Sequence, residues 1–173
     1  MRIKEERLYN IIFPIWLLVA IPPIVFITLP LNFAIDFAVL FYTMKYLKIE
    51  GAKKKTKSVI WEVWSYGFLS DIIGGVFMLL VYFLEDFFPA YGDWLYENLG
   101  KAVMFNPFES IWGFLWICTC LLIVGLCIYF FNLKKSFKSL DIPYEDKKKL
   151  ALSLAILTAP YLYFIPYDFF GGY

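Results

Sequence analysis

Residues 59–84 read VIWEVWSYGFLSDIIGGVFMLLVYFL, and this stretch decides the fold. It carries only two charges, Glu62 near one end and Asp71 near the centre. As a helix that rises about 1.5 Å per residue, it is long enough to cross the roughly 30 Å hydrocarbon layer of a bilayer. A charged group at that depth disfavours insertion by about 2.5–3.5 kcal/mol, so Asp71 should face protein or water rather than lipid.

The composition agrees with a membrane environment. The chain is 61% hydrophobic and 22% aromatic over 173 residues, which is more apolar surface than a soluble domain of this size can bury. The formal net charge of +1 gives no overall excess that would indicate a nucleic-acid partner. We therefore expect an all-α integral membrane protein, a compact bundle in one domain (1–173) surrounded by the lipid bilayer.

The apolar segments and the prolines predict about five membrane-spanning helices. Pro30 is expected to form a turn between the first two; in an alternative model these two form a re-entrant hairpin, which leaves three full spans. Pro22, Pro23 and Pro160 are predicted kinks, because proline removes a backbone donor inside a helix. The expected spans are 9–30, 31–47, 59–84, 110–132 and 150–166.

Residues 88–106 differ from these spans because they contain charged residues, and their aromatic and aliphatic residues share one helical face away from Asp93, Glu97 and Lys101. One interpretation is an amphipathic helix that lies in the membrane interface with its apolar face down. The other is a loop folded over the mouth of the bundle. The sequence favours neither.

The positive charges are segregated along the chain. The N-terminal segment and the regions 45–57 and 134–149 hold fifteen of the sixteen Lys and Arg residues, and with five spans all three fall on one side. The positive-inside rule makes that side cytoplasmic, with the N-terminus inside and the C-terminus outside. These lysines can also hold anionic lipid headgroups or dock a cytoplasmic protein. Lysine greatly outnumbers arginine, as is typical of AT-rich bacterial genomes, so we expect a bacterial cytoplasmic membrane.

The surroundings of Asp71 suggest a site. Gly67, Ser70, Asp71 and Gly74 follow the i, i+3, i+4, i+7 spacing of one helix face, whose small residues let another helix come close. The Gly74 and Gly75 pair has two interpretations. It can open the helix and offer backbone groups to a solute, as discontinuous helices do in transporters, or it can mark a tight helix crossing.

Asp36 is the second acid within an expected span. Counting residues along the two spans places it about 10 Å from Asp71 in depth, which argues against a direct pair. The two acids can line one polar path, with Tyr66 and Ser70 as intermediate groups, and carry a proton or bind a cation. The alternative is that each acid is structural and hydrogen-bonded to a neighbouring helix.

Other residue types narrow the chemistry. The sequence contains no histidine, which removes His-based metal and haem sites and His-activated nucleophiles. Cys118, Cys120 and Cys127 lie in one apolar run, where a thiol packs as a small hydrophobe. No catalytic motif is found, and we expect no metal or cofactor.

Three functional hypotheses follow. The leading one is a non-enzymatic membrane subunit that binds or passes a small solute or ion, as a homo-oligomer or with another membrane protein. The second is an accessory, sensing or immunity protein that docks another membrane protein. The third is a membrane enzyme that acts on lipid, which the missing catalytic residue types disfavour.

Overall fold

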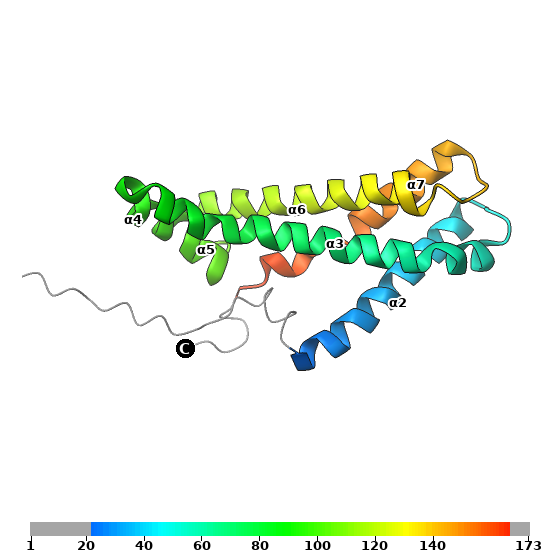
Figure 1. Ribbon diagram of the computed structural model, residues 1–173, viewed down its shortest axis with the longest axis horizontal. Coiled ribbons are helices and arrows are strands. Elements are labelled where there is room, and N and C mark those ends of the chain that lie inside the picture. The colour runs from blue at the N-terminus through cyan, green and yellow to red at the C-terminus, as the bar shows by residue number, and fades with distance from the viewer. Residues whose placement is uncertain (1–21, 167–173) are drawn as a thin grey trace, which may run out of the picture.

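The computed structural model describes residues 22–166, and within this range the chain is almost wholly helical with no strand. Four long helices build the bundle (Figure 1): α2 (Pro22–Tyr46), α3 (Ala52–Phe87), α6 (Ile111–Phe131) and α7 (Tyr144–Leu157). Short helical segments connect and extend them: η1 (Pro89–Tyr91), α4 (Gly92–Leu95), η2 (Tyr96–Gly100), α5 (Lys101–Met104), η3 (Asn132–Ser136) and η4 (Tyr161–Phe164).

Three of the helical stretches in the described range are long and apolar enough to cross a membrane. They are Phe26–Tyr46, Ala52–Phe87 and Ile111–Ser136. Large apolar side chains such as Phe83 and Leu122 point outward on them. An outer surface of this kind suits contact with lipid tails and is unfavourable in water. The all-helical prediction is confirmed, and the expected spans 59–84 and 110–132 correspond to α3 and α6.

The expected turn at Pro30 is wrong. Pro30 lies inside α2, which continues without a break to Tyr46, so neither two short spans nor a re-entrant hairpin divides the chain there. A proline inside a helix removes one hydrogen bond, and apolar helices tolerate that loss where neighbouring groups satisfy the freed carbonyl. Residues 9–21 of the expected first span lie outside the described residues. Pro22 and Pro23 are the first two residues of α2, and the residues before them are not described, so the kink expected there stays a prediction.

The expected fifth span, 150–166, is broken rather than bent. α7 ends at Leu157, and Pro160 is followed by the separate 3-10 turn η4. Proline cannot donate to the preceding turn, so the helix stops before it. The Thr158 amide bonds back to the carbonyl of Leu154, and the Tyr161 hydroxyl donates to the carbonyl of Ile156 at 2.6 Å. The end of α7 is thereby satisfied although the helix is short.

The four long helices enclose a common core. α2 packs against α3 and α7, and α6 packs against the same two helices. On α6 the buried positions recur every three or four residues, which is the spacing of one helix face. The cysteines on α6 are free thiols, and Cys120 lies in this core, as the packing interpretation predicted. The buried positions of α6 are Gly113, Ile117, Cys120, Val124 and Ile128.

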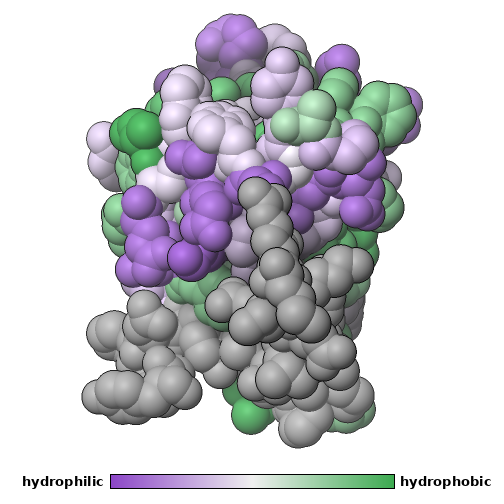
Figure 2. Space-filling view, turned by 90° about the vertical axis from the view of Figure 1, so that its left-hand side faces the viewer, coloured by the Kyte–Doolittle hydropathy of each residue, from purple (hydrophilic) through white to green (hydrophobic). Residues whose placement is uncertain are grey.

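The two ends of the bundle differ in chemistry. The lysine-rich connections from α2 to α3 and from α6 to α7 lie at the same end of the long axis (Figure 1). α4 and α5 lie at the opposite end, which faces the viewer in Figure 2 and shows a band of hydrophilic residues. The segment 88–106 is mostly helical and packs back on α3 and α6, where Gly113 lies against Ala102. It is therefore not an irregular loop.

A candidate ion or proton site in the bundle centre

Two acids from different helices come together inside the bundle. Asp36 on α2 is only 6% exposed, and its Oδ2 atom faces α3, where a Cβ atom on Gly67 would lie 3.5 Å away. Gly67 is one turn from Asp71, an offset of about 6 Å along the helix axis. The Asp36 carboxyl group therefore lies about one helical turn from Asp71 along α3. This offset is smaller than the depth difference of about 10 Å that counting residues along separate spans predicted.

The Asp71 side chain has a polar atom without a partner. Its Oδ1 atom is buried and has no hydrogen-bond partner among the described residues. Burying an unpaired carboxylate oxygen is costly, and a second carboxyl group nearby increases the cost when both are ionised. A proton or a cation bound at the pair would lower that cost.

The end of α7 reaches the same place. The hydroxyl of Thr158, the residue after α7, lies close enough to interact with the Asp36 carboxyl group and is 2.9 Å from the carbonyl oxygen of Leu154. A hydroxyl has one proton to donate. If Asp36 is protonated, it can donate to Thr158 while Thr158 donates to Leu154. If Asp36 is ionised, Thr158 can turn its proton toward the carboxylate. Thr158 thus accommodates both protonation states of Asp36.

η4 contributes a further contact to α3, near Gly74. The Tyr163 hydroxyl donates to the backbone carbonyl oxygen of Asp71 at 3.3 Å. Gly74 makes room for this contact, because a Cβ atom there would lie 2.8 Å from the Tyr163 hydroxyl and would overlap Val124 of α6. The electrostatics are also uniform in sign, since the C-terminal end of α7 carries partial negative charge close to the acids. The arrangement favours a proton or a cation over an anion.

The structure decides between the two interpretations of the glycine pair. α3 is continuous through Gly74 and Gly75, so it does not open there, and Gly74 marks a tight crossing with α6. The helix that breaks inside the bundle is α7. Discontinuous helices are a recurrent source of ion-binding groups in transporters. In this bundle the broken helix is α7 rather than α3.

Ser70 and Tyr66, predicted as polar groups beside Asp71, have other contacts. The Ser70 hydroxyl is buried and donates to the carbonyl oxygen of Tyr66 at 2.7 Å. The Tyr66 ring packs against Phe131, with 5.6 Å between ring centroids. No contact that the structure shows for either side chain reaches the acidic pair.

Sequence reasoning missed Thr158 and Tyr163. Both follow the end of α7 and meet the acids only through long-range packing. The available signal was a polar and aromatic run around Pro160 in an otherwise apolar segment. A further polar contact joins the same helices, because Thr43 Oγ1 and Ser153 Oγ lie 2.7 Å apart, two turns from Asp36 toward the lysine-rich end.

These features define a class: a helical protein with three helices able to span a membrane, in which Asp36 of α2 is buried and the part-buried Asp71 of α3 has a buried Oδ1 atom. No family model matches the sequence, and neither a curated protein nor a solved structure is detectably similar to it.

Proposed function

We propose that this chain is a multi-pass protein of the bacterial cytoplasmic membrane that binds or passes a proton or a small monovalent cation at Asp36 and Asp71. The lysine-rich end faces the cytoplasm in this proposal. The observation that carries it is the buried Oδ1 atom of Asp71, which has no hydrogen-bond partner among the residues 22–166, near the buried carboxyl group of Asp36. Acids inside membrane-spanning helices are costly and commonly mark ion or proton pathways.

The chemistry around the acids supports a small ligand. Two surface hollows, one lined by Phe41 and nearby lysines and one by residues 108–114, lie away from the acidic pair. The groups that converge on the pair are a hydroxyl, backbone carbonyls and carboxyl oxygens. Hard oxygen ligands of this type suit a proton or an alkali cation rather than an organic solute.

The polar contacts between α2 and α7 suggest how a proton reaches the pair. Thr43 and Ser153 lie between the lysine-rich end and Asp36, and Thr158 lies at Asp36 itself. Hydroxyl groups both donate and accept, so they can relay protons between waters. Because the chain supplies few helices to enclose a complete path, we propose that it works as a homo-oligomer or with another membrane protein.

Flux measurements test this proposal directly. Purified protein is reconstituted into liposomes that contain a pH-sensitive dye, and a potassium gradient with valinomycin drives proton entry. A parallel assay compares the unfolding temperature in sodium chloride and choline chloride. We expect the wild type to pass protons faster than empty liposomes, or to be stabilised by sodium. Asp36→Asn and Asp71→Asn should each reduce the effect at least tenfold, because amides cannot exchange a proton or neutralise a cation.

Asp86→Asn is the matched control, since Asp86 is an exposed acid at the far end of α3, and it should behave as wild type. Asp71→Glu keeps a carboxyl group and should retain part of the effect, which separates loss of chemistry from loss of folding. The proposal is overturned if the wild type shows neither flux nor sodium stabilisation, or if the Asn variants match Asp86→Asn. Co-purification of another membrane protein in fixed ratio would then favour the docking hypothesis.

A further inference from the structure

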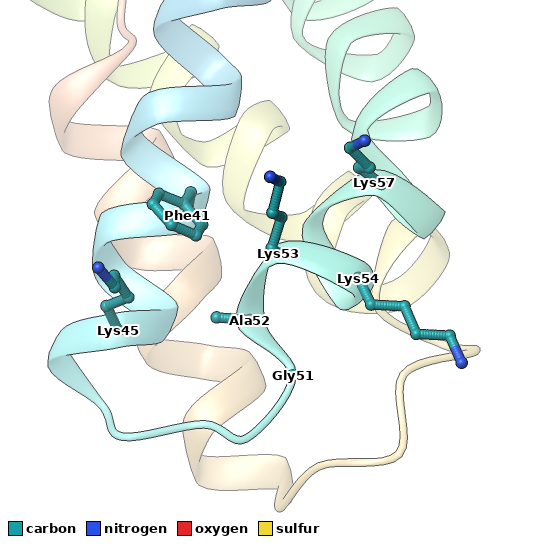
Figure 3. A pocket seen from close by; sticks show the side chains of 7 residues that line it. All are labelled: Phe41, Lys45, Gly51, Ala52, Lys53, Lys54 and Lys57. Atoms are coloured by element: carbon teal, nitrogen blue, oxygen red, sulfur yellow. The ribbon is translucent and has the colours of Figure 1, made fainter.

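A hollow with basic walls lies at the lysine-rich end, between the end of α2 and the start of α3 (Figure 3). Its volume is about 660 Å³. Phe41 and Lys45 line it from α2, and Ala52, Lys53 and Lys57 line it from α3. The lining therefore combines a mostly apolar surface, which includes Phe41, with lysine side chains from two helices.

The lysines that border the hollow come from two different helices. Lys53 and Lys57 are four residues apart on α3 and so project from the same face. Lys45 lies across the hollow on α2, with its ammonium nitrogen 5.2 Å from the centre of the Phe41 ring. Lys54 also borders the hollow, but Figure 3 shows its side chain directed away from the other three.

These positive charges are not neutralised within the described part of the chain. The ion pairs formed there involve Lys101, Lys148 and Lys149, and none includes a lysine of the hollow. Glu50, the acid nearest in sequence, is exposed in the connecting turn. Among the described residues, no acid pairs with Lys45, Lys53 or Lys57, which is what binding of an external anion requires.

The position of the hollow identifies the kind of anion. Lys45 is in the last turn of α2, at the end of the membrane-spanning stretch Phe26–Tyr46, and the apolar run of α3 begins just beyond Lys57. A group bound between these lysines lies at the level of lipid headgroups, with Phe41 on the side of the hydrocarbon layer. A phospholipid presents the complementary order, a phosphate above and apolar chains below.

We propose that this hollow binds the headgroup of an anionic phospholipid, with the phosphate between Lys45, Lys53 and Lys57 and the first acyl carbons against Phe41. The inference uses the membrane placement of the proposed function but not its acidic pair. Failure of ion flux with intact lipid binding, or the reverse, therefore distinguishes the two proposals.

Native mass spectrometry in mild detergent tests the site with two probes, phosphatidylglycerol and phosphatidylcholine. We expect wild-type protein to retain phosphatidylglycerol in preference to phosphatidylcholine. The triple variant Lys45→Gln, Lys53→Gln, Lys57→Gln should bind phosphatidylglycerol at least tenfold more weakly. The matched control replaces three lysines at the same end outside the hollow, Lys134→Gln, Lys135→Gln and Lys138→Gln, and should bind as wild type does.

Two further measurements make the result specific. Phe41→Ala should weaken phosphatidylglycerol binding although every charge remains, and added inorganic phosphate should not displace the lipid. Unfolding temperatures in phosphatidylcholine identify any variant that fails to fold, and Lys→Arg at the three positions should restore binding. Equal loss in both triple variants, no preference for phosphatidylglycerol, or full displacement by inorganic phosphate would each overturn the proposal.

Discussion

The Tyr163 hydroxyl donates a 3.3 Å hydrogen bond to the backbone carbonyl oxygen of Asp71, although the two residues are 92 positions apart. This contact joins the turn after α7 to the middle of α3. It holds the broken end of α7 beside the acidic pair, and it depends on a glycine one turn away that leaves space for the ring. The site is therefore a product of packing between distant segments.

The first prediction concerns that glycine. Gly74→Ala should lower the free energy of unfolding by about 1–3 kcal/mol, the usual cost of an added methyl group in a closely packed interior. The new Cβ atom would overlap Val124 and lie 2.8 Å from the Tyr163 hydroxyl. Unfolding in mixed detergent micelles, followed by circular dichroism, measures the change.

Gly125→Ala is the matched control for this substitution. It makes the same change on α6, where the nearest atom to the new Cβ, the carbonyl oxygen of Ala155, is at an ordinary 3.7 Å. Alanine has the higher helix propensity, so this variant should be neutral or slightly stabilised. Equal destabilisation of both variants would show that α3 and α6 do not cross closely at Gly74.

Removing only the Tyr163 hydroxyl is a second test. Tyr163→Phe should cost about 0.5–1.5 kcal/mol, the net value of a typical hydrogen bond, because the ring stays in place. Tyr161→Phe serves for comparison, since that hydroxyl bonds the nearby carbonyl of Ile156 at the end of α7 and the side chain is exposed. The Tyr163 variant should also change the sodium or proton response of the acidic pair, whereas a response identical to wild type would contradict a connection between η4 and the site.

The contact between α2 and α7 predicts an energetic coupling. Thr43 Oγ1 and Ser153 Oγ are 2.7 Å apart and form one side-chain hydrogen bond between the helices. In a double-mutant cycle with Thr43→Val and Ser153→Ala, the coupling free energy should be about 0.6 kcal/mol, the average for such bonds between membrane helices. Additive effects of the two substitutions would mean that the hydroxyl groups do not meet.

The fourth prediction tests the arrangement of the two ends across a membrane. The three native cysteines are replaced by alanine, and single cysteines are introduced as Lys54→Cys, Lys135→Cys and Glu97→Cys. A membrane-impermeant maleimide should label position 97 in intact cells, and positions 54 and 135 only after permeabilisation. The reason is that α3 and α6 each connect the lysine-rich end to the opposite end.

The alanine background without added cysteines is the control for nonspecific labelling. Positions 54 and 135 belong to different connections, so their agreement is the informative result. If they label from opposite sides, α3 and α6 do not both cross the bilayer and the proposed orientation is wrong.

How well the sequence predicted the structure differs from element to element. The spans at 59–84 and 110–132 were predictable because long apolar runs are local properties that any helix of that length displays. The end of α7 before Pro160 and the continuation of α2 through Pro30 were not predictable from the sequence. The same residue type ends one helix and is accommodated in another, and the surrounding contacts decide which outcome occurs.

The sequence by itself determined that the chain is helical and apolar enough for a membrane, and that Asp71 needs a partner inside the bundle. Hydropathy and charge are sums over neighbouring residues, so they can be read along the chain. Only the tertiary structure decided that Asp36 lies beside Gly67, that α7 stops short of a full span, and that Thr158 and Tyr163 reach the acidic pair. The physical reason is that the partner of a buried group depends on which helices pack together, and local patterns do not specify that choice.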